Sequence, residues 1–140
     1  MHFSLIFFYH NLDANRVAID CNSPYDEVTL PGTSITSTNY PSRYNNSEDC
    51  EVTIRFSSDK KVNITLEKFY VESHPTCVYD FLAIYDGDST NSPIIGSKLC
   101  GKIDTEKSIL STGNVMTLHF HSDSSQTRTG FRVHSYAVGK

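Results

Sequence analysis

The stretch Cys77-Val78-Tyr79-Asp80-Phe81-Leu82-Ala83-Ile84-Tyr85-Asp86-Gly87 holds the clearest strand signal in the sequence. Residues 81–85 are apolar on both faces, which is typical of a strand covered on both sides. A cysteine and an acidic residue precede this run, and the turn-forming Asp86-Gly87-Asp88 follows it. The stretch therefore predicts a central strand of a buried sheet.

Apolar and polar side chains alternate in the segments around it. Residues 50–56 and 62–67 have a period of two, and residues 115–120 and 131–136 complete the set of predicted strands. Turn signals rich in Pro, Gly and Asn separate these segments. No window of twelve residues carries an apolar helical stripe. The sequence therefore predicts one all-β sandwich, with two sheets packed face to face.

Length and charge limit the function. The chain has 140 residues, the length of one domain with a short extension. The 12 Lys and Arg against 16 Asp and Glu give a net charge of −4. Nucleic-acid-binding proteins carry a clustered basic excess, so no nucleic acid partner is expected. The basic residues are scattered in sequence, so they predict no glycosaminoglycan patch by themselves.

The N-terminal segment, residues 1–20, is interpreted in two ways. Its apolar run at residues 3–9 is too short to span a bilayer, which takes about 20 residues, so no transmembrane segment is expected. It is either a weak signal peptide or the start of a fragment of a longer chain. We expect it to lie outside the fold.

The cysteines Cys21, Cys50, Cys77 and Cys100 point to an oxidising compartment. A four-cysteine zinc site is built from two close pairs of the form C-x2-4-C, and no two cysteines here lie close in sequence. Disulfides are the better interpretation, and they predict a secreted, extracellular protein. The residues alone leave three connectivities open.

Two sequons agree with that compartment. Asn45-Asn46-Ser47 and Asn63-Ile64-Thr65 both fit the N-x-[ST] pattern of N-glycosylation. The alternative is that Asn45 and Asn63 are ordinary solvated side chains.

No catalytic motif is present in the sequence. It lacks a G-x-S-x-G elbow, an H-E-x-x-H helix and a glycine-rich phosphate loop, so we expect no enzyme activity from this chain. His119 and His121 share one face of a predicted strand, a spacing that two zinc ligands can use. Alternation turns Leu118 and Phe120 inward, so both histidines are expected to be exposed strand residues without a metal.

Three acidic residues form a candidate calcium site. Glu72 and Asp80 lie on either side of Cys77, and Asp123 follows a predicted strand. Calcium takes six to eight oxygen ligands from carboxylates, backbone carbonyls and water. The alternative is that all three carboxylates are solvated at the surface.

Several motifs resemble those of the CUB domain family. Residues 35–44 are similar to the family's I-x-S-P-N-Y-P-x-x-Y, with Thr38 in place of the usual Pro. Residues 69–72 and 77–87 are similar to its F-x-x-E…C-x-Y-D-x-L-x-I-x-D-G core. Cys100-Gly101, Phe120-His121-Ser122-Asp123 and Gly130-Phe131 stand where the family has CG, F-x-S-D and GF. The resemblance covers residues 21–138, where we expect one CUB domain.

This resemblance implies a jelly-roll-like sandwich of two antiparallel sheets. It also implies the disulfides Cys21–Cys50 and Cys77–Cys100, and extracellular life beside protease, EGF-like or further CUB modules. One departure is Val52, where many members carry Trp.

The resemblance also implies a calcium site and a way of binding partners. The calcium-binding subset of the family has one Glu and two Asp at the places of Glu72, Asp80 and Asp123, and we add the backbone of Ser125 as a ligand. Tyr44 matches the Tyr whose hydroxyl holds the residue equivalent to Glu72. Such members capture a Lys or Arg side chain of a protein partner at this site, which implies partner contacts for Tyr44, Glu72 and Asp123.

We therefore expect an extracellular, calcium-binding protein-interaction module. Three alternatives remain open from the sequence. They are a non-catalytic CUB module of a secreted protease, a glycan-binding CUB adhesin with a glycosaminoglycan as partner, and a structural spacer without a partner.

Overall fold

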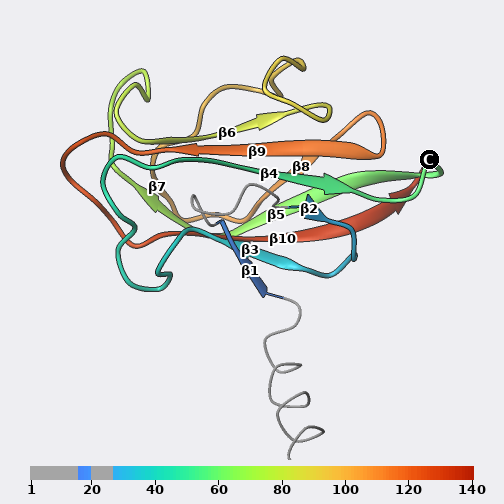
Figure 1. The fold of residues 1–140 in the computed structure, drawn as a ribbon, viewed down its shortest axis with the longest axis horizontal. Helices are drawn as coiled ribbons and strands as arrows, with labels where there is room; N and C mark the ends of the chain where they lie inside the picture. Colours follow the sequence, from blue (N-terminus) through green and yellow to red (C-terminus); the bar gives the residue numbers. More distant parts are fainter. Residues whose placement is uncertain (1–15, 20–26) are drawn as a thin grey trace, which may run out of the picture.

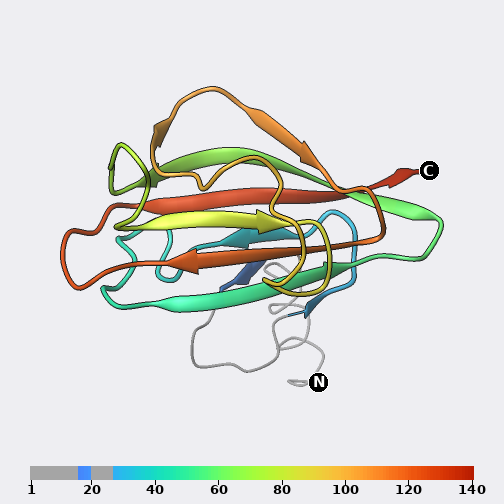
Figure 2. The ribbon, with the colours of Figure 1, turned by 90° about the horizontal axis from the view of Figure 1, so that it is seen from above.

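Two β-sheets packed face to face make up the part of the chain that a computed structural model describes, residues 16–19 and 27–140 (Figures 1 and 2). The first sheet has the order β1-β3-β10-β5-β7, and β8 also pairs with β5. Its strands are β1 (Arg16–Ala18), β3 (Ser34–Thr36), β5 (Lys60–Val71), β7 (Gly101–Ile103), β8 (Lys107–Leu110) and β10 (Gly130–Gly139). We call it sheet A.

The second sheet, sheet B, has the order β2-β4-β9-β6. Its strands are β2 (Glu27–Val28), β4 (Asp49–Arg55), β6 (Phe81–Tyr85) and β9 (Val115–His121). No helix in the described residues is long and apolar enough to cross a membrane. The predicted all-β sandwich is confirmed.

The core lies between the sheets, where the alternating segments meet. Val52 and Ile54 of β4 face Val62 and Ile64 of β5, and Leu118 of β9 joins them; all are fully buried. Burial of such side chains stabilises each by about 1.5–3 kcal/mol. Val52 thus keeps the buried place at which the family often has Trp.

The sheets are not purely antiparallel, which corrects the expectation. β1 pairs with β3 in parallel, and β2 pairs with β4 in parallel. Parallel neighbours need a connection of a dozen or more residues. The long segments between β1 and β3, and between β2 and β4, meet this need, and both parallel strands are short and lie at sheet edges.

The sandwich includes residues that precede the expected boundary at residue 21. Strand β1 pairs along its whole length with β3. The N–H of Ile19 donates to the carbonyl of Thr36 over 2.8 Å, and the Ile19 side chain is buried in the core. A three-residue strand has no detectable period, so the sequence pattern did not indicate it.

Strand β6 lies at an edge of sheet B, opposite the edge formed by β2, and is not the central strand that its composition predicted. The segment after it covers the free edge: Leu82 and Leu99 exchange two backbone hydrogen bonds of 2.9 Å. The outer face is covered by side chains, because Phe81 stacks on His121 and the Lys98 ammonium lies 4.2 Å from the Phe81 ring centroid. An edge strand that is covered in this way is apolar on both faces.

The disulfide Cys77–Cys100 is present and agrees with the pairing that the resemblance implied. It ties the loop between β5 and β6 to the start of β7. Cys21 lies outside the described residues, so the pairing Cys21–Cys50 stays a prediction.

Candidate metal centre

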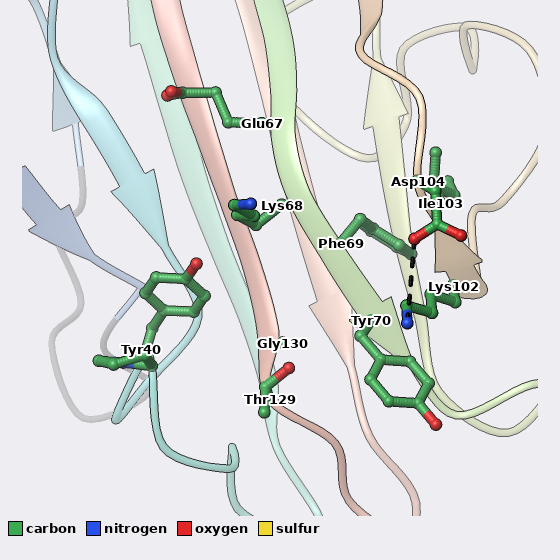
Figure 3. Close-up of a pocket in the computed structure, with 11 residues that line it drawn as sticks. Tyr40, Glu67, Lys68, Phe69, Tyr70, Lys102, Ile103, Asp104, Thr129 and Gly130 are labelled. Atoms are coloured by element: carbon green, nitrogen blue, oxygen red, sulfur yellow. Dashed lines mark ion pairs between the residues drawn. The ribbon is translucent and has the colours of Figure 1, made fainter.

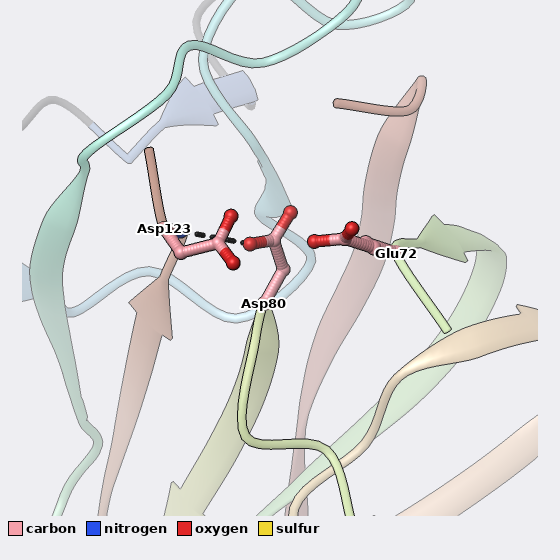
Figure 4. A group of neighbouring side chains, drawn as sticks. All are labelled: Glu72, Asp80 and Asp123. Carbon is pink, nitrogen blue, oxygen red and sulfur yellow. Dashed lines mark hydrogen bonds between the residues drawn. The ribbon is translucent and has the colours of Figure 1, made fainter. Parts of the chain in front are cut away.

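Three strand ends meet at one end of the sandwich and bring the three predicted carboxylates together (Figure 4). Glu72 directly follows β5, Asp80 directly precedes β6, and Asp123 lies just beyond β9. β6 and β9 are antiparallel with Phe81 opposite His121, so the start of one lies beside the end of the other. One carboxylate oxygen of each residue lies within 4.8 Å of the other two.

Asp80 stands between the other two carboxylates and is fully buried (Figure 4). Its Oδ1 accepts a hydrogen bond of 2.8 Å from the backbone N–H of Asp123. Its Oδ2 accepts one of 2.6 Å from the hydroxyl of Tyr44. Two donors on two different segments therefore hold this carboxylate in one orientation.

The buried side chain of Tyr44 is hydrogen-bonded to two of the three acidic residues, Asp80 and Glu72. Its ring is buried edge-on against Phe120, with 4.9 Å between the centroids. Its hydroxyl donates to Asp80 and accepts a hydrogen bond of 3.1 Å from the backbone N–H of Glu72. The resemblance implied that this hydroxyl holds Glu72. The structure has it touch the Glu72 backbone, while the proton goes to Asp80.

Glu72 has an unpaired oxygen. The residue is 8% exposed, and its Oε1 is buried without a hydrogen-bond partner among the residues that the structure describes. Buried polar atoms are nearly always paired, because an unpaired one costs the free energy of its lost hydration. An oxygen of this kind, directed toward two further carboxylates, fits a bound cation.

Burial and mutual repulsion act on the acidity of these groups. Burial, followed by the charges of Asp80 and Asp123, raises the pKa of Glu72, and the charge of Arg128 opposes this. Burial also raises the pKa of Asp80, against the hydrogen bond from Tyr44 that lowers it. Burial and the bond to Asp80 raise the pKa of Tyr44, so its phenol stays a donor. The carboxylates are thus ionised at a cost that a cation offsets.

A second layer of hydrogen bonds fixes the loop that carries Asp123. The Ser122 hydroxyl donates to the carbonyl of Asn45 over 2.7 Å and accepts from the Glu48 N–H over 2.9 Å. The Ser47 N–H donates to the Asp123 carbonyl over 2.7 Å. Neither Ser122 nor Glu48 was predicted to have a role, although Ser122 stands within the F-x-S-D motif.

Ser125 lies in an exposed turn next to the carboxylates. Its N–H donates to the Oδ1 of Asp123 over 3.3 Å. Its role as a backbone ligand remains a prediction. The exposed Asn45 lies at this end too, whereas Asn63 lies on β5, far along the sheet.

The two histidines of β9 point to the outer face of sheet B, as expected, but they are only partly exposed. The His119 ring is hydrogen-bonded to Asp49, and the Nδ1 of His121 lies 3.6 Å from the same carboxylate. Phe81 of the next strand packs against both rings. Their neighbours across the sheet, which the sequence pattern does not reveal, account for this burial.

A shallow groove of about 500 Å³ on sheet A gathers residues of both charges (Figure 3). Lys68 and Lys102 line it together with Glu67 and Asp104. Lys102 lies 4.0 Å from Asp104, and both side chains are well exposed. This mixture of charges does not form the basic patch that binds a glycosaminoglycan.

Comparisons with known proteins agree with this architecture. The CUB domain profile matches residues 21–135. Tolloid-like protein 1 of Mus musculus is 37% identical over 123 residues, which cover 86% of this chain and 12% of that protein. The chain therefore spans about an eighth of the length of this relative.

Solved structures give the same result. The extracellular region of zebrafish Gpr126/Adgrg6 matches with a TM-score of 0.74 and 32% identity, over 84% of this chain and 15% of that chain. The CUB2 domain of MASP-1, solved bound to Ca²⁺, matches with a TM-score of 0.69 and 29% identity, over 79% of this chain and 96% of that one. Together with the profile match and the sandwich, these likenesses identify the fold family: the chain belongs to the CUB domain family.

Proposed function

We propose that this CUB domain, a non-catalytic module, works outside the cell by binding Ca²⁺ and then capturing a basic side chain of a protein partner. Glu72, Asp80 and Asp123 are the ligands of the ion in this proposal, with the Ser125 backbone as a further ligand. The observation that carries it is the unpaired, buried Oε1 of Glu72 beside two other carboxylates.

The chemistry of the donor set favours calcium. Three carboxylates are hard oxygen donors, and calcium completes its shell with carbonyls and water. The ligand atoms come from both sheets, so the ion links sheet A to sheet B at this end of the sandwich. The likeness to a CUB domain that was solved with Ca²⁺ supports the same choice of ion.

Charge arithmetic supports the capture of a basic group. Three ionised carboxylates carry −3, and one Ca²⁺ leaves the site at −1, close to the surface through the partly exposed Asp123. A lysine or arginine side chain of the partner then pairs with an oxygen that the ion already holds in place. Little side-chain entropy is lost on this side of the contact, which favours binding.

Calorimetric titration of the full chain with CaCl₂ tests the ion. We expect one site in the wild type and none in Asp123→Ala, with a melting curve of wild type that moves to lower temperature in EDTA. The exposed Asp88→Ala, in the loop after β6, serves as the matched control and keeps the site. A melting curve that EDTA leaves in place contradicts the calcium proposal.

The capture step is tested separately with a lysine probe. Blocked lysine, N-acetyl-lysine amide with a free side-chain amine, is titrated into the calcium-loaded chain and followed by NMR. Shifts of the backbone signals around Tyr44 and Asp123 are expected in calcium and not in EDTA. Identical responses to blocked lysine and blocked norleucine contradict capture of a basic group.

A second candidate function rests on the length of the relatives. Because the chain spans 12% of tolloid-like protein 1 of Mus musculus, it is also compatible with a module of a much longer protein, such as a secreted protease. A transcript that continues into an H-E-x-x-H motif or a Ser/His/Asp set supports this candidate. In that setting the calcium site provides the contact with a substrate or a partner.

A further inference from the structure

One row of three side chains crosses the outer face of sheet A, away from the carboxylates. Asn63 of β5 lies directly opposite Tyr136 of β10 on one side and Leu110 of β8 on the other. Figure 2 shows these three strands side by side, with β5 between β8 and β10. Glu72 follows the end of β5, whereas Asn63 lies near its start. The row and the carboxylates therefore belong to different parts of the sandwich.

The side chains of this row point outward. Val62 and Ile64, the chain neighbours of Asn63, are fully buried in the core, so strand alternation turns Asn63 to the opposite face. Tyr136 is 44% exposed and Leu110 is 48% exposed, and directly opposite residues on one face lie about 5 Å apart at Cβ. Asn63 is thus flanked on both sides by exposed apolar side chains.

The amide of Asn63 has no other engagement. It makes no hydrogen bond or ion pair in the part of the chain that the structure describes, although it is only partly exposed. The second sequon differs only at its oxygen: the Oδ1 of Asn45 accepts a hydrogen bond of 3.1 Å from the amide of Asn39, and this bond leaves the amide nitrogen of Asn45 unused. What distinguishes Asn63 is the exposed apolar side chain that flanks it on each side of the sheet.

We propose that Asn63 carries an N-linked glycan whose first sugar packs between Tyr136 and Leu110. The amide nitrogen of Asn63 forms a bond to C1 of the sugar, and the bond from C1 to the phosphate of a lipid-diphosphate-linked oligosaccharide breaks. The amide loses one proton, and the lipid diphosphate is the leaving group. No oxidant or reductant takes part.

The order of the strands makes Asn63 accessible for this transfer. Both neighbours of β5 at this position come later in the chain, since β8 starts at Lys107 and β10 at Gly130. When residues 60–71 enter the secretory pathway, neither strand that flanks Asn63 in the folded sheet has yet followed. The sheet then closes around an asparagine that is already modified.

In the folded sheet, the ring of Tyr136 offers an apolar surface on which the attached sugar can pack. A pyranose ring has a C–H face that packs on the ring of a tyrosine, and tyrosine favours places with one apolar and one wet side. The sugar covers part of the Tyr136 and Leu110 side chains, which are otherwise exposed on the outer face of sheet A.

Mass spectrometry of the full chain, directed through the secretory pathway of cultured mammalian cells by a cleavable leader, tests the attachment. We expect a glycan on the peptide that contains Asn63, its loss in Thr65→Val, and its retention in Thr65→Ser. Secreted protein with unmodified Asn63 overturns the proposal. This readout depends on secretion but not on calcium, so the calcium titration of the same sample fails or succeeds independently.

Thermal melting tests the packing. The chain is produced in mammalian cells that lack N-acetylglucosaminyltransferase I, so that its glycan stays oligomannose and endoglycosidase H trims it to one sugar. The Tm is then compared with that of Asn63→Gln. We expect the sugar to raise the Tm by about 4 °C, and to raise it by less than half of that in a Tyr136→Ala background. An equal gain in both backgrounds overturns the packing. Leu110→Ala repeats the comparison if Tyr136→Ala is not secreted.

Discussion

Replacing Glu72 with Gln separates the cost of gathering three carboxylates from the benefit of the calcium that we propose they bind. The amide has nearly the shape of the carboxylate but carries no charge. Glu72 is 8% exposed, its Oε1 has no hydrogen-bond partner among the described residues, and it faces two more carboxylates. We expect Glu72→Gln to stabilise the calcium-free domain and to weaken calcium binding.

The distances between the carboxylates give the size of the stabilisation that Glu72→Gln should cause in the absence of calcium. Two unit charges separated by 4.8 Å, the upper limit within this cluster, repel by about 0.9 kcal/mol in water and about 3.5 kcal/mol at an effective dielectric constant of 20. The partly exposed Asp123 admits water, and Arg128 offsets part of the repulsion. We therefore expect a gain of about 1–2 kcal/mol, or a rise in Tm of about 4–8 °C.

The effect of Glu72→Gln on stabilisation by calcium has the opposite sign. A ligand at 100 times its Kd stabilises the folded state by about 2.7 kcal/mol, so saturating calcium raises the Tm of the wild type by about 10 °C. Removing one of three charged ligands lowers the affinity strongly, because the number of charged ligands sets Kd. Calcium is then expected to raise the Tm of Glu72→Gln by less than about 3 °C.

Differential scanning calorimetry in EDTA and in 10 mM calcium (about 100 times a Kd of 10⁻⁴ M) measures both effects. The expected result is that Glu72→Gln melts higher than the wild type in EDTA and gains less than about a third as much Tm from calcium as the wild type does. Glu106→Gln, an exposed residue between β7 and β8, is the matched control and should follow the wild type in both buffers. A Glu72→Gln variant that is less stable in EDTA, or that keeps the full calcium response, refutes the reasoning.

Three further predictions concern the same site. Tyr44→Phe removes the hydrogen bond to Asp80 and leaves the backbone N–H of Glu72 unpaired. Chemical denaturation should therefore show that the free energy of unfolding falls by about 2–4 kcal/mol. An unchanged unfolding midpoint would argue against the role of this hydroxyl. Burial raises the pKa of Glu72 and of Asp80 in the folded state, so that state binds more protons than the unfolded chain above about pH 4, the ordinary range of these carboxyls. The Tm in EDTA should therefore fall as the pH rises above about 4, while the gain in Tm from calcium grows; a flat profile in both buffers contradicts this. Replacing both Cys77 and Cys100 with Ser should destabilise the domain by about 3 kcal/mol. It should also weaken calcium binding, measured by calorimetry, because the disulfide holds the loop between Glu72 and Asp80. An unaltered Kd for calcium contradicts that coupling.

The sequence predicted those strands in which apolar and polar residues alternate over several positions. The alternation in residues 50–56 and 62–67 correctly indicated strands with one buried face, because a strand that lies on a core must alternate. The same reasoning was wrong about the place of β6. Its side chains are apolar because Lys98, His121 and the segment before Cys100 cover it, and these contacts are remote in sequence.

The three carboxylates were identified from motif resemblance, and their mutual distance was not available from spacing. Glu72 and Asp80 flank one loop, but Asp123 is brought to them only by the antiparallel register of β6 and β9. The short strands β1 and β2 and their parallel pairing were not predicted, since two or three residues contain no period to detect.

The sequence by itself predicted the sandwich and singled out the three acidic residues, because alternation and motifs are properties of neighbouring positions, and its cysteines predicted an oxidising compartment. Only the tertiary structure decided that Tyr44 donates to Asp80 and that Asn63 stands between Tyr136 and Leu110. It also decided that one oxygen of Glu72 is buried without a hydrogen-bond partner among the described residues. Each of these depends on side chains from different strands meeting at one point. The register of the sheets sets such meetings, and register is an outcome of packing the whole core.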